Sequence, residues 1–452
     1  MSRSSARIPS AAGCARPRVA GFSLIELMVA ITLGVLLSIG IVTLFGATSK
    51  TNKVQDALAR LQENGRYALT RITDDLRMSS AQYCSSSGSQ GWTTSANDGP
   101  MYPGLTILAN ANGVSTAANG SFPDSGGLLG VLPTPGSTYP LGPAAFMQGY
   151  ECADGGGCTP ALPIGTAPNG LPDEGEADGL RVRGADVLTI RYQRGTGWNF
   201  TVNQAVVPAT VTLTRAVVGT QPMDDTPNFA TNDRALLLTC GGGQIFQVSA
   251  SGNPPTLTPV GLENTSNYKP AATVASFDVR VFNFSKDFVT VSYYLAYKND
   301  PDVAGRLIPS LYRRENGTQT DELVQGVERL DFIYATQYRD ASLHYLTADQ
   351  VNANSNATNC PPPSPGLGLP LGNVEPGCLW RSVKNVEAHL LLDTVNDIKL
   401  ESSDMAYRYT ATGDTTMHIP GGPTQQMPNG EVTGYMMRRE FIASVTTRNG
   451  NF

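Results

Sequence analysis

The sequence predicts an α+β protein in which one long N-terminal helix packs against an antiparallel β-sheet with large loop insertions. An apolar run followed by an amphipathic pattern of helical period extends from residue 22 to residue 78. Beyond residue 180, short segments of alternating apolar and polar residues follow one another with few helical patterns between them, which favours an antiparallel sheet. The 47 glycines and 31 prolines, with only 15% charged residues, are typical of a loop-rich β protein.

Residues 1–21 form a basic leader. They contain no acid and no long apolar stretch before the Gly21-Phe22 junction, so they differ from an ordinary secretory signal, in which the apolar stretch is removed. Positive charge in front of an apolar span places the N-terminus in the cytoplasm and the rest of the chain outside it. The charge comes from four arginines, Arg3, Arg7, Arg16 and Arg18.

The apolar run from Phe22 to Ala47 predicts a membrane-spanning helix. At about 1.5 Å per residue the run is roughly 39 Å long, which is enough to cross a bilayer. Its one charge, Glu26, costs about 2.5–3.5 kcal/mol in lipid and therefore needs a partner. If the chain is cut after Gly21, the new ammonium of Phe22 lies about one helical turn from Glu26.

The helix is expected to continue through residues 48–78. Apolar residues recur there at three- and four-residue steps or their multiples, which predicts a stripe that packs on the sheet. Gly65 weakens such a helix by about 1 kcal/mol relative to alanine without ending it. The stripe consists of Val54, Leu58, Leu61, Leu69, Ile72 and Leu76.

Residues 79–180 are rich in Ser, Gly, Pro, Asn and Thr, a composition that disfavours long regular elements. We interpret this stretch as an extended surface insertion, with a recognition loop as the alternative. The acids at 173–178 do not follow the EF-hand pattern, so a calcium site is not expected there.

The cysteines indicate disulfides. Cys14 belongs to the leader, and the remaining even number in an exported protein favours pairing in an oxidising compartment. Cys152 with Cys158 and Cys360 with Cys378 are close in sequence and are the favoured pairs. Zinc is disfavoured because the spacing is too wide and the three histidines are scattered. The candidates for disulfides are Cys84, Cys152, Cys158, Cys240, Cys360 and Cys378.

Residues 181–452 are expected to form a β-rich domain outside the membrane. A short helix at 348–353 has Thr347 as its N-cap, and the Pro/Gly-rich residues 360–378 predict a loop closed by its two cysteines. A hairpin is predicted from 234–239 and 244–249. Further strands are predicted at 186–193, 273–284, 288–298, 310–314, 327–338, 385–394 and 435–447.

Motifs of catalysis are missing from the sequence. It contains no P-loop, no dinucleotide-binding fingerprint, no nucleophile elbow and no HExxH motif, so an enzyme, a cofactor and a metal are not expected. The net charge of −6 gives no support for nucleic-acid binding. The pairs Arg313-Arg314 and Arg438-Arg439 are more typical of solubility or ion pairs than of phosphate binding.

The junction resembles the class III signal of type IV prepilins and type II secretion pseudopilins, with Gly21 at −1, Phe22 at +1 and Glu26 at +5. The C-terminal half is similar to the PilW family of minor type IV pilins. The segments that carry this similarity are 186–192, Leu311-Tyr312-Arg313-Arg314, 322–328, Leu346-Thr347-Ala348-Asp349-Gln350-Val351, 383–392 and 438–449.

The resemblance implies that prepilin peptidase cleaves between Gly21 and Phe22, that the Phe22 amine is methylated, and that Glu26 pairs with the N-terminus of a neighbouring subunit. It implies a minor pilin that helps initiate type IV pilus assembly near the tip and supports twitching motility or adhesion. Its partners would be other minor pilins, the major pilin, the assembly platform and inner-membrane lipid, with the C-terminal domain in the periplasm.

Two alternatives remain open on the sequence. A minor pseudopilin of type II secretion shares the signal and a segment like Leu311–Arg314. A signal-anchored periplasmic binding protein that never polymerises is the second alternative, and it predicts an uncleaved N-terminus.

Overall fold

The computed structural model contains two compact units, residues 1–57 and residues 58–452. The residues that the structure describes are 23–79, 105–108, 138–140, 146–162, 170–203, 210–214, 217–218, 221–222, 229–239, 242–252, 255–260, 280–317, 319–360, 377–398, 405–411, 413–419 and 436–447.

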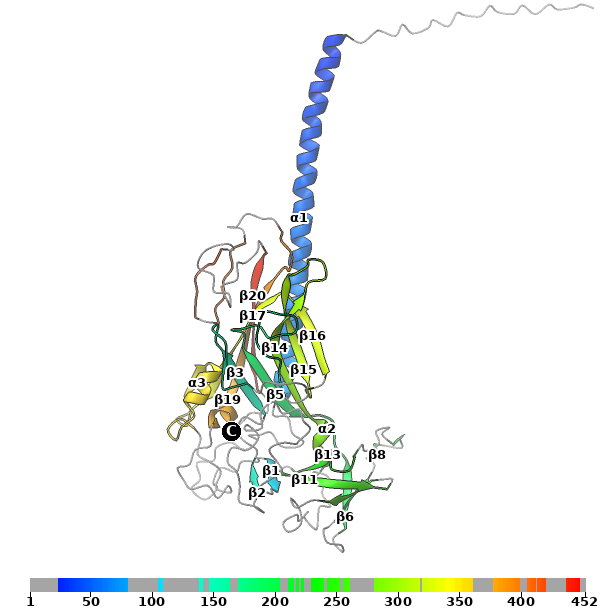
Figure 1. Cartoon of the computed structure of the whole chain (residues 1–452), viewed down its shortest axis with the longest axis vertical. Helices are drawn as coiled ribbons and strands as arrows, with labels where there is room; N and C mark the ends of the chain where they lie inside the picture. The colour runs from blue at the N-terminus through cyan, green and yellow to red at the C-terminus, as the bar shows by residue number, and fades with distance from the viewer. Residues whose placement is uncertain are drawn as a thin grey trace, which may run out of the picture. The chain divides into compact units, whose positions relative to one another are not determined.

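One helix, α1 (Leu24–Met78), begins in the first unit and ends in the second (Figure 1). It confirms the long helix predicted from the sequence. Apolar side chains between Leu24 and Phe45 are exposed, whereas Leu61, Ala68, Ile72 and Leu76 are buried in the second unit. The change from all-apolar to amphipathic sequence therefore coincides with the change from an exposed helix to a packed one.

The first sheet is antiparallel and has the order β16-β15-β14-β5-β3-β4. Its strands β5 and β14 are buried along nearly their whole length, including the polar residues Thr189, Thr290 and Ser292 that alternate with the apolar ones. The strands are β3 (Met147–Cys152), β4 (Cys158–Thr159), β5 (Val187–Gln193), β14 (Phe288–Asn299), β15 (Leu307–Glu315) and β16 (Gln319–Gln325).

The second sheet is also antiparallel, in the order β18-β17-β19-β20, with bounds Leu343–Leu346, Val327–Gln337, Val383–Asp393 and Arg438–Thr446. The helix α3 (Ala348–Ala353) follows β18. Thr347 and Gln350 form a capping box at its start, as the Thr347 cap predicted. A 3₁₀ helix, η3 (Cys378–Ser382), precedes β19. One apolar core joins the buried stripe of α1 to both sheets.

A third sheet with its own apolar cluster is formed largely by strands between β5 and β14, which are neighbours in the first sheet (Figure 1). Its order is β13-β10-β11-β12-β7-β6, with β1 parallel to β11 and β2 beside β1. The bounds are β1 Leu105–Leu108, β2 Thr138–Pro140, β6 Asn199–Asn203, β7 Thr210–Thr214, β10 Arg234–Thr239, β11 Gly242–Ser251, β12 Thr256–Pro259 and β13 Arg280–Asn283. The remaining short elements are β8 (Val217–Val218), β9 (Gln221–Pro222) and α2 (Phe284–Asp287).

The stretch 79–180, predicted as a loop insertion, contains strands. β3 pairs with β5 and is buried, so the first sheet begins before residue 180. Its sequence, Met147–Cys152, alternates for only one short segment between Gly- and Pro-rich neighbours. The composition of the surroundings therefore concealed a strand that tertiary packing stabilises.

Gly65 allows the helix to approach the second sheet closely. A Cβ atom at this position would lie 2.5 Å from Cε1 of Phe441 on β20, which is closer than any carbon contact tolerates. Gly65 lowers the helix propensity, but its lack of a side chain lets the Phe441 ring pack directly against the helix backbone.

Gly65→Ala should lower the stability of the second unit by up to about 2 kcal/mol, because overpacking by about 1–3 kcal/mol outweighs a propensity gain of about 1 kcal/mol. Chemical denaturation of the protein in detergent measures this change. In a Phe441→Ala background, where the ring is gone, the same substitution should stabilise. A stabilising effect in the wild-type background would contradict the close packing.

Candidate functional site

The start of α1 is the region to which the sequence assigns assembly. Gly21 and Phe22 lie outside the described residues. Glu26 lies in the first turn, where its backbone N–H donates to the carbonyl oxygen of Ser23 at 3.0 Å. Its side chain is exposed and makes no hydrogen bond or ion pair to any residue that the structure describes. A carboxylate at such a position on an apolar helix would be costly to bury without a cation.

The rest of the apolar segment is fit for lipid. Within the described ranges α1 is the one helix long and apolar enough to cross a membrane, judged by length and composition. Its hydroxyl groups are satisfied within the helix, since each donates to a carbonyl oxygen three or four residues earlier, at 2.8–2.9 Å. These residues are Thr32, Ser38, Thr43 and Thr48.

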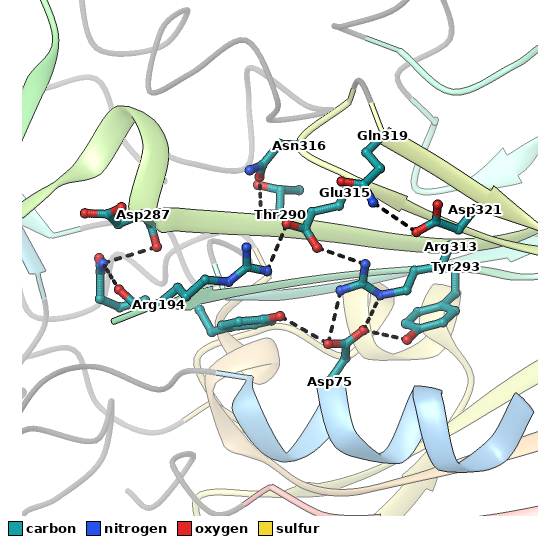
Figure 2. Close-up of polar contacts among 12 residues, drawn as sticks. Asp75, Arg194, Asp287, Thr290, Tyr293, Arg313, Glu315, Asn316, Gln319 and Asp321 are labelled. Carbon is teal, nitrogen blue, oxygen red and sulfur yellow. Dashed lines mark hydrogen bonds and ion pairs between the residues drawn. The ribbon is translucent and has the colours of Figure 1, made fainter. Parts of the chain in front are cut away.

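The last turns of α1 are fixed to the first sheet by a buried ion pair between Asp75 and Arg313 of β15 (Figure 2). The Arg313 guanidinium donates from Nε to Asp75 Oδ2 at 2.7 Å and from Nη2 to Oδ1 at 3.3 Å. Both side chains are at most 11% exposed. The two-pronged contact fixes direction as well as distance, because the guanidinium plane must align with the carboxylate.

Two tyrosines complete the environment of Asp75. The hydroxyl of Tyr293, on β14, lies 2.5 Å from Asp75 Oδ2 and 2.9 Å from the carbonyl oxygen of Arg71. The hydroxyl of Tyr192, on β5, donates to Asp75 Oδ1 at 3.1 Å. Three adjacent strands of the first sheet therefore each bring one donor to a single carboxylate of the helix, as Figure 2 shows around Asp75.

The network extends across the sheet through a second carboxylate. Arg313 Nη1 donates to Glu315 Oε2 at 2.9 Å, and Glu315 Oε1 lies 2.9 Å from Nη2 of Arg194, which follows β5. Two arginines and two acids thus alternate, so each nitrogen of the buried Arg313 guanidinium has a carboxylate acceptor and the four formal charges balance. We call Asp75, Arg313, Tyr192, Tyr293 and Glu315 the helix anchor.

The charges and burial within the helix anchor raise the pKa values of its donors Tyr293 and Arg313. Burial, then the negative charge of Asp75, raises the pKa of Tyr293, so its hydroxyl remains a donor. Burial acts to lower the pKa of Arg313, but the hydrogen bonds and charge of Asp75, followed by Glu315, outweigh it and the pKa is raised. The Tyr293 hydroxyl and the Arg313 guanidinium therefore keep the protons that they donate to Asp75.

Of the pair Arg438-Arg439, Arg438 also forms a buried ion pair between two elements. Arg438, on β20, donates from Nε and Nη2 to Glu328 of β17 at 2.6 and 2.8 Å, and both side chains are buried. Its guanidinium also lies 5.6 Å from the ring centre of Tyr407. The interpretation of these arginines as ion-pairing residues agrees with their contacts, but Arg313 and Arg438 are buried structural groups and not surface charges on sheet edges.

Two disulfides are present among the described residues, Cys152–Cys158 and Cys360–Cys378, the pairs closest in sequence. The first closes the turn between β3 and β4, and the second ties the chain after α3 to the start of η3. Cys84 and Cys240, the other candidates, lie outside the described residues, as does most of the loop between Cys360 and Cys378.

Sequence reasoning did not find the helix anchor. The available signal was the position of Asp75 three residues after Ile72, which places an acid on the apolar stripe of the helix. A buried acid requires a cation, and Arg313 is 238 residues away in the chain. Only the tertiary fold shows which arginine forms the ion pair with Asp75.

Asp75→Asn should destabilise the second unit by about 3 kcal/mol, because Arg313 keeps Glu315 but loses the charge that balances it in a buried site. Asp74→Asn is the matched control: Asp74 is exposed, its nearest guanidinium, Arg77, is 3.9 Å away, and a change within about 0.5 kcal/mol is expected. Denaturant unfolding measures both. Equal effects of the two variants would show that the anchor does not hold the helix.

Comparison with known families gives two matches. Residues 16–42 match the prokaryotic N-terminal methylation motif, and residues 292–449 match the family of type IV pilus-assembly protein W, PilW. The second match begins within β14 and covers the whole second sheet. No curated protein and no solved structure matches the chain. The two matches confirm the resemblance found in the sequence: residues 16–42 are similar to the N-terminal methylation motif, and residues 292–449, less than half of the chain, are similar to the PilW family, which supports a pilin related to type IV pilus assembly.

Proposed function

We propose that this protein is a minor pilin that helps to initiate type IV pilus assembly and is incorporated near the tip of the pilus, where it supports twitching motility or adhesion. The observation that carries the proposal is the combination in one chain of the methylation motif, an exposed apolar helix and a PilW-type domain. At 452 residues the chain is large for a subunit that must repeat thousands of times.

In this proposal the leader, residues 1–21, is removed between Gly21 and Phe22 by prepilin peptidase, and the Phe22 amine is methylated. Residues 22–47 then hold the protein in the inner membrane as a single-pass anchor, with residues 181–452 in the periplasm. On assembly, the exposed apolar faces of Leu24–Phe45 pack among the helices of other minor pilins and of the major pilin, with the assembly platform as a further partner.

The charge of Glu26 supports this mechanism physically. The side chain lies on an otherwise apolar helix and has no partner among the described residues. Pairing with the Phe22 amine of a neighbouring subunit would remove an unpaired charge from the apolar interior of a filament, which favours the assembled state.

Mass spectrometry of the N-terminal peptide of the membrane-bound protein tests the cleavage. The expected result is a peptide that begins at methylated Phe22 and disappears when prepilin peptidase is inactive. An intact leader in both samples would contradict the proposal and favour a periplasmic protein with a permanent signal anchor.

Glu26→Val should leave cleavage and membrane insertion intact but reduce incorporation into sheared pili by about tenfold or more, because a buried charge pair is lost. Glu63→Gln, an exposed acid farther along the same helix, is the control and should be incorporated normally. The measurement is the ratio of the protein in pili to that in membranes. Normal incorporation of Glu26→Val would remove Glu26 from the assembly mechanism.

Deletion of the gene distinguishes the two filament systems. Loss of twitching and of surface pili is expected for the minor pilin. Retention of exported enzymes in the periplasm, with normal twitching, would instead indicate a minor pseudopilin of type II secretion.

A further inference from the structure

Three acidic side chains lie together where the first and second sheets meet. Glu151 is on β3, Asp186 directly precedes β5, and Asp331 is on β17. Asp186 is 2% exposed and Asp331 is 7% exposed. We call these three residues the carboxyl seam. The charge of Asp331 acts to raise the pKa of both Glu151 and Asp186, and the charge of Glu151 acts to raise that of Asp186.

Asp186 connects the two sheets directly. Its Oδ1 accepts the backbone N–H of Cys152, on β3, at 3.1 Å, and its Oδ2 accepts the backbone N–H of Phe332, on β17, at 3.1 Å. Its own N–H donates to the carbonyl oxygen of Leu330 at 2.8 Å. Two of these hydrogen bonds reach β17 in the second sheet and one reaches β3 in the first, so one buried residue joins the two sheets.

The seam is tight and incompletely paired. A Cβ atom at Gly149 would lie 2.2 Å from the hydroxyl oxygen of Tyr334, so the backbone of β3 packs directly against the end of this side chain from β17. The Tyr334 hydroxyl and Glu151 Oε2 are buried without a hydrogen-bond partner among the described residues. Ionisation of Glu151 would therefore place negative charge beside a buried oxygen that has no donor among the described residues.

The groups around the seam supply little positive charge. Arg329, on β17, is the cation; its Nη2 lies 3.5 Å from Asp331 Oδ1 and its Nη1 lies 4.0 Å from Oδ1 of the exposed Asp154. Asp349 of α3 adds negative charge near Glu151, and the Ala348 N–H donates to Glu151. The remaining titratable neighbours are the phenols of Tyr150, Tyr334 and Tyr409, the last donating to Asp331.

We propose that the carboxyl seam is a proton-controlled clamp between the two sheets, closed while it holds protons and weakened when Glu151 ionises. With Arg329 as the one guanidinium in contact with these acids among the described residues, a buried cluster of this kind retains protons in the closed state. The folded unit is then more tightly joined in acid than at neutral pH. A pilin domain outside the membrane is exposed to the pH of its surroundings, so the joint between its sheets would respond to them.

The direction follows from linkage. Burial, followed by the charges of Asp331 and Asp349, raises the pKa of Glu151 from 4.5 to about 7, and burial raises that of Asp186 well above its ordinary value. The closed state binds the proton more tightly than the open state. The contribution to stability is therefore full below about pH 4.5 and is lost as the pH rises through about 7.

Hydrogen exchange of the mature full-length protein in detergent, followed by mass spectrometry from pH 5 to pH 9, tests the clamp. The peptides that contain the amides of Cys152 and Phe332 report on the seam. After correction for intrinsic exchange, ionisation of Glu151 should raise the opening constant by up to about tenfold per pH unit between pH 5 and 7, and its effect should level off above pH 7.

Glu151→Gln keeps the size of the side chain and cannot ionise, so its slope against pH should be shallower than that of the wild type by up to about one logarithmic unit per pH unit. Glu176→Gln, an exposed acid in the same stretch of chain, should keep the wild-type slope. The proposal is overturned if Glu151→Gln keeps that slope too. A wild-type opening constant that does not change between pH 5 and 7 overturns it without any variant.

Discussion

The position of α1 on the globular unit depends on one carboxylate that faces the sheet. Apolar packing of Leu61, Ile72 and Leu76 favours burial of the helix but is non-directional and tolerates sliding or rotation. The Asp75–Arg313 pair does not, because its hydrogen bonds need a fixed orientation of both groups. The ion pair therefore fixes the orientation of the last turns of α1 on the first sheet.

Two buried ion pairs, each between an arginine and an acid, link elements in the region that is similar to PilW. Arg313 and Arg438 each donate to an acid on another element, Asp75 and Glu328, and neither acid is a neighbour in sequence. Hydrophobic burial provides most of the stabilisation of such a unit, whereas buried ion pairs contribute less net energy and select one arrangement of the strands.

Much of the fold could be predicted from the sequence because period is a local property. The helix Leu24–Met78 and the strands β5, β14, β17 and β19 carry long, strong patterns, and the capping box of α3 is visible at Thr347. β16 was missed because an exposed edge strand of polar residues has no such pattern. The helix anchor and the carboxyl seam join residues more than one hundred positions apart, and local patterns contain no information on such pairs.

Most of the third sheet is formed by a chain segment that begins and ends at one pair of opposing residues in the first sheet. Gln193, the last residue of β5, is the register partner of Phe288, the first residue of β14. The segment that connects these two residues, which includes most strands of the third sheet, therefore begins and ends at paired positions. Because its ends are held close together, making this segment longer or shorter changes the entropy of loop closure only slightly. Variation of this segment in length or composition can therefore change the exposed surface while the sheet that holds the helix keeps its register.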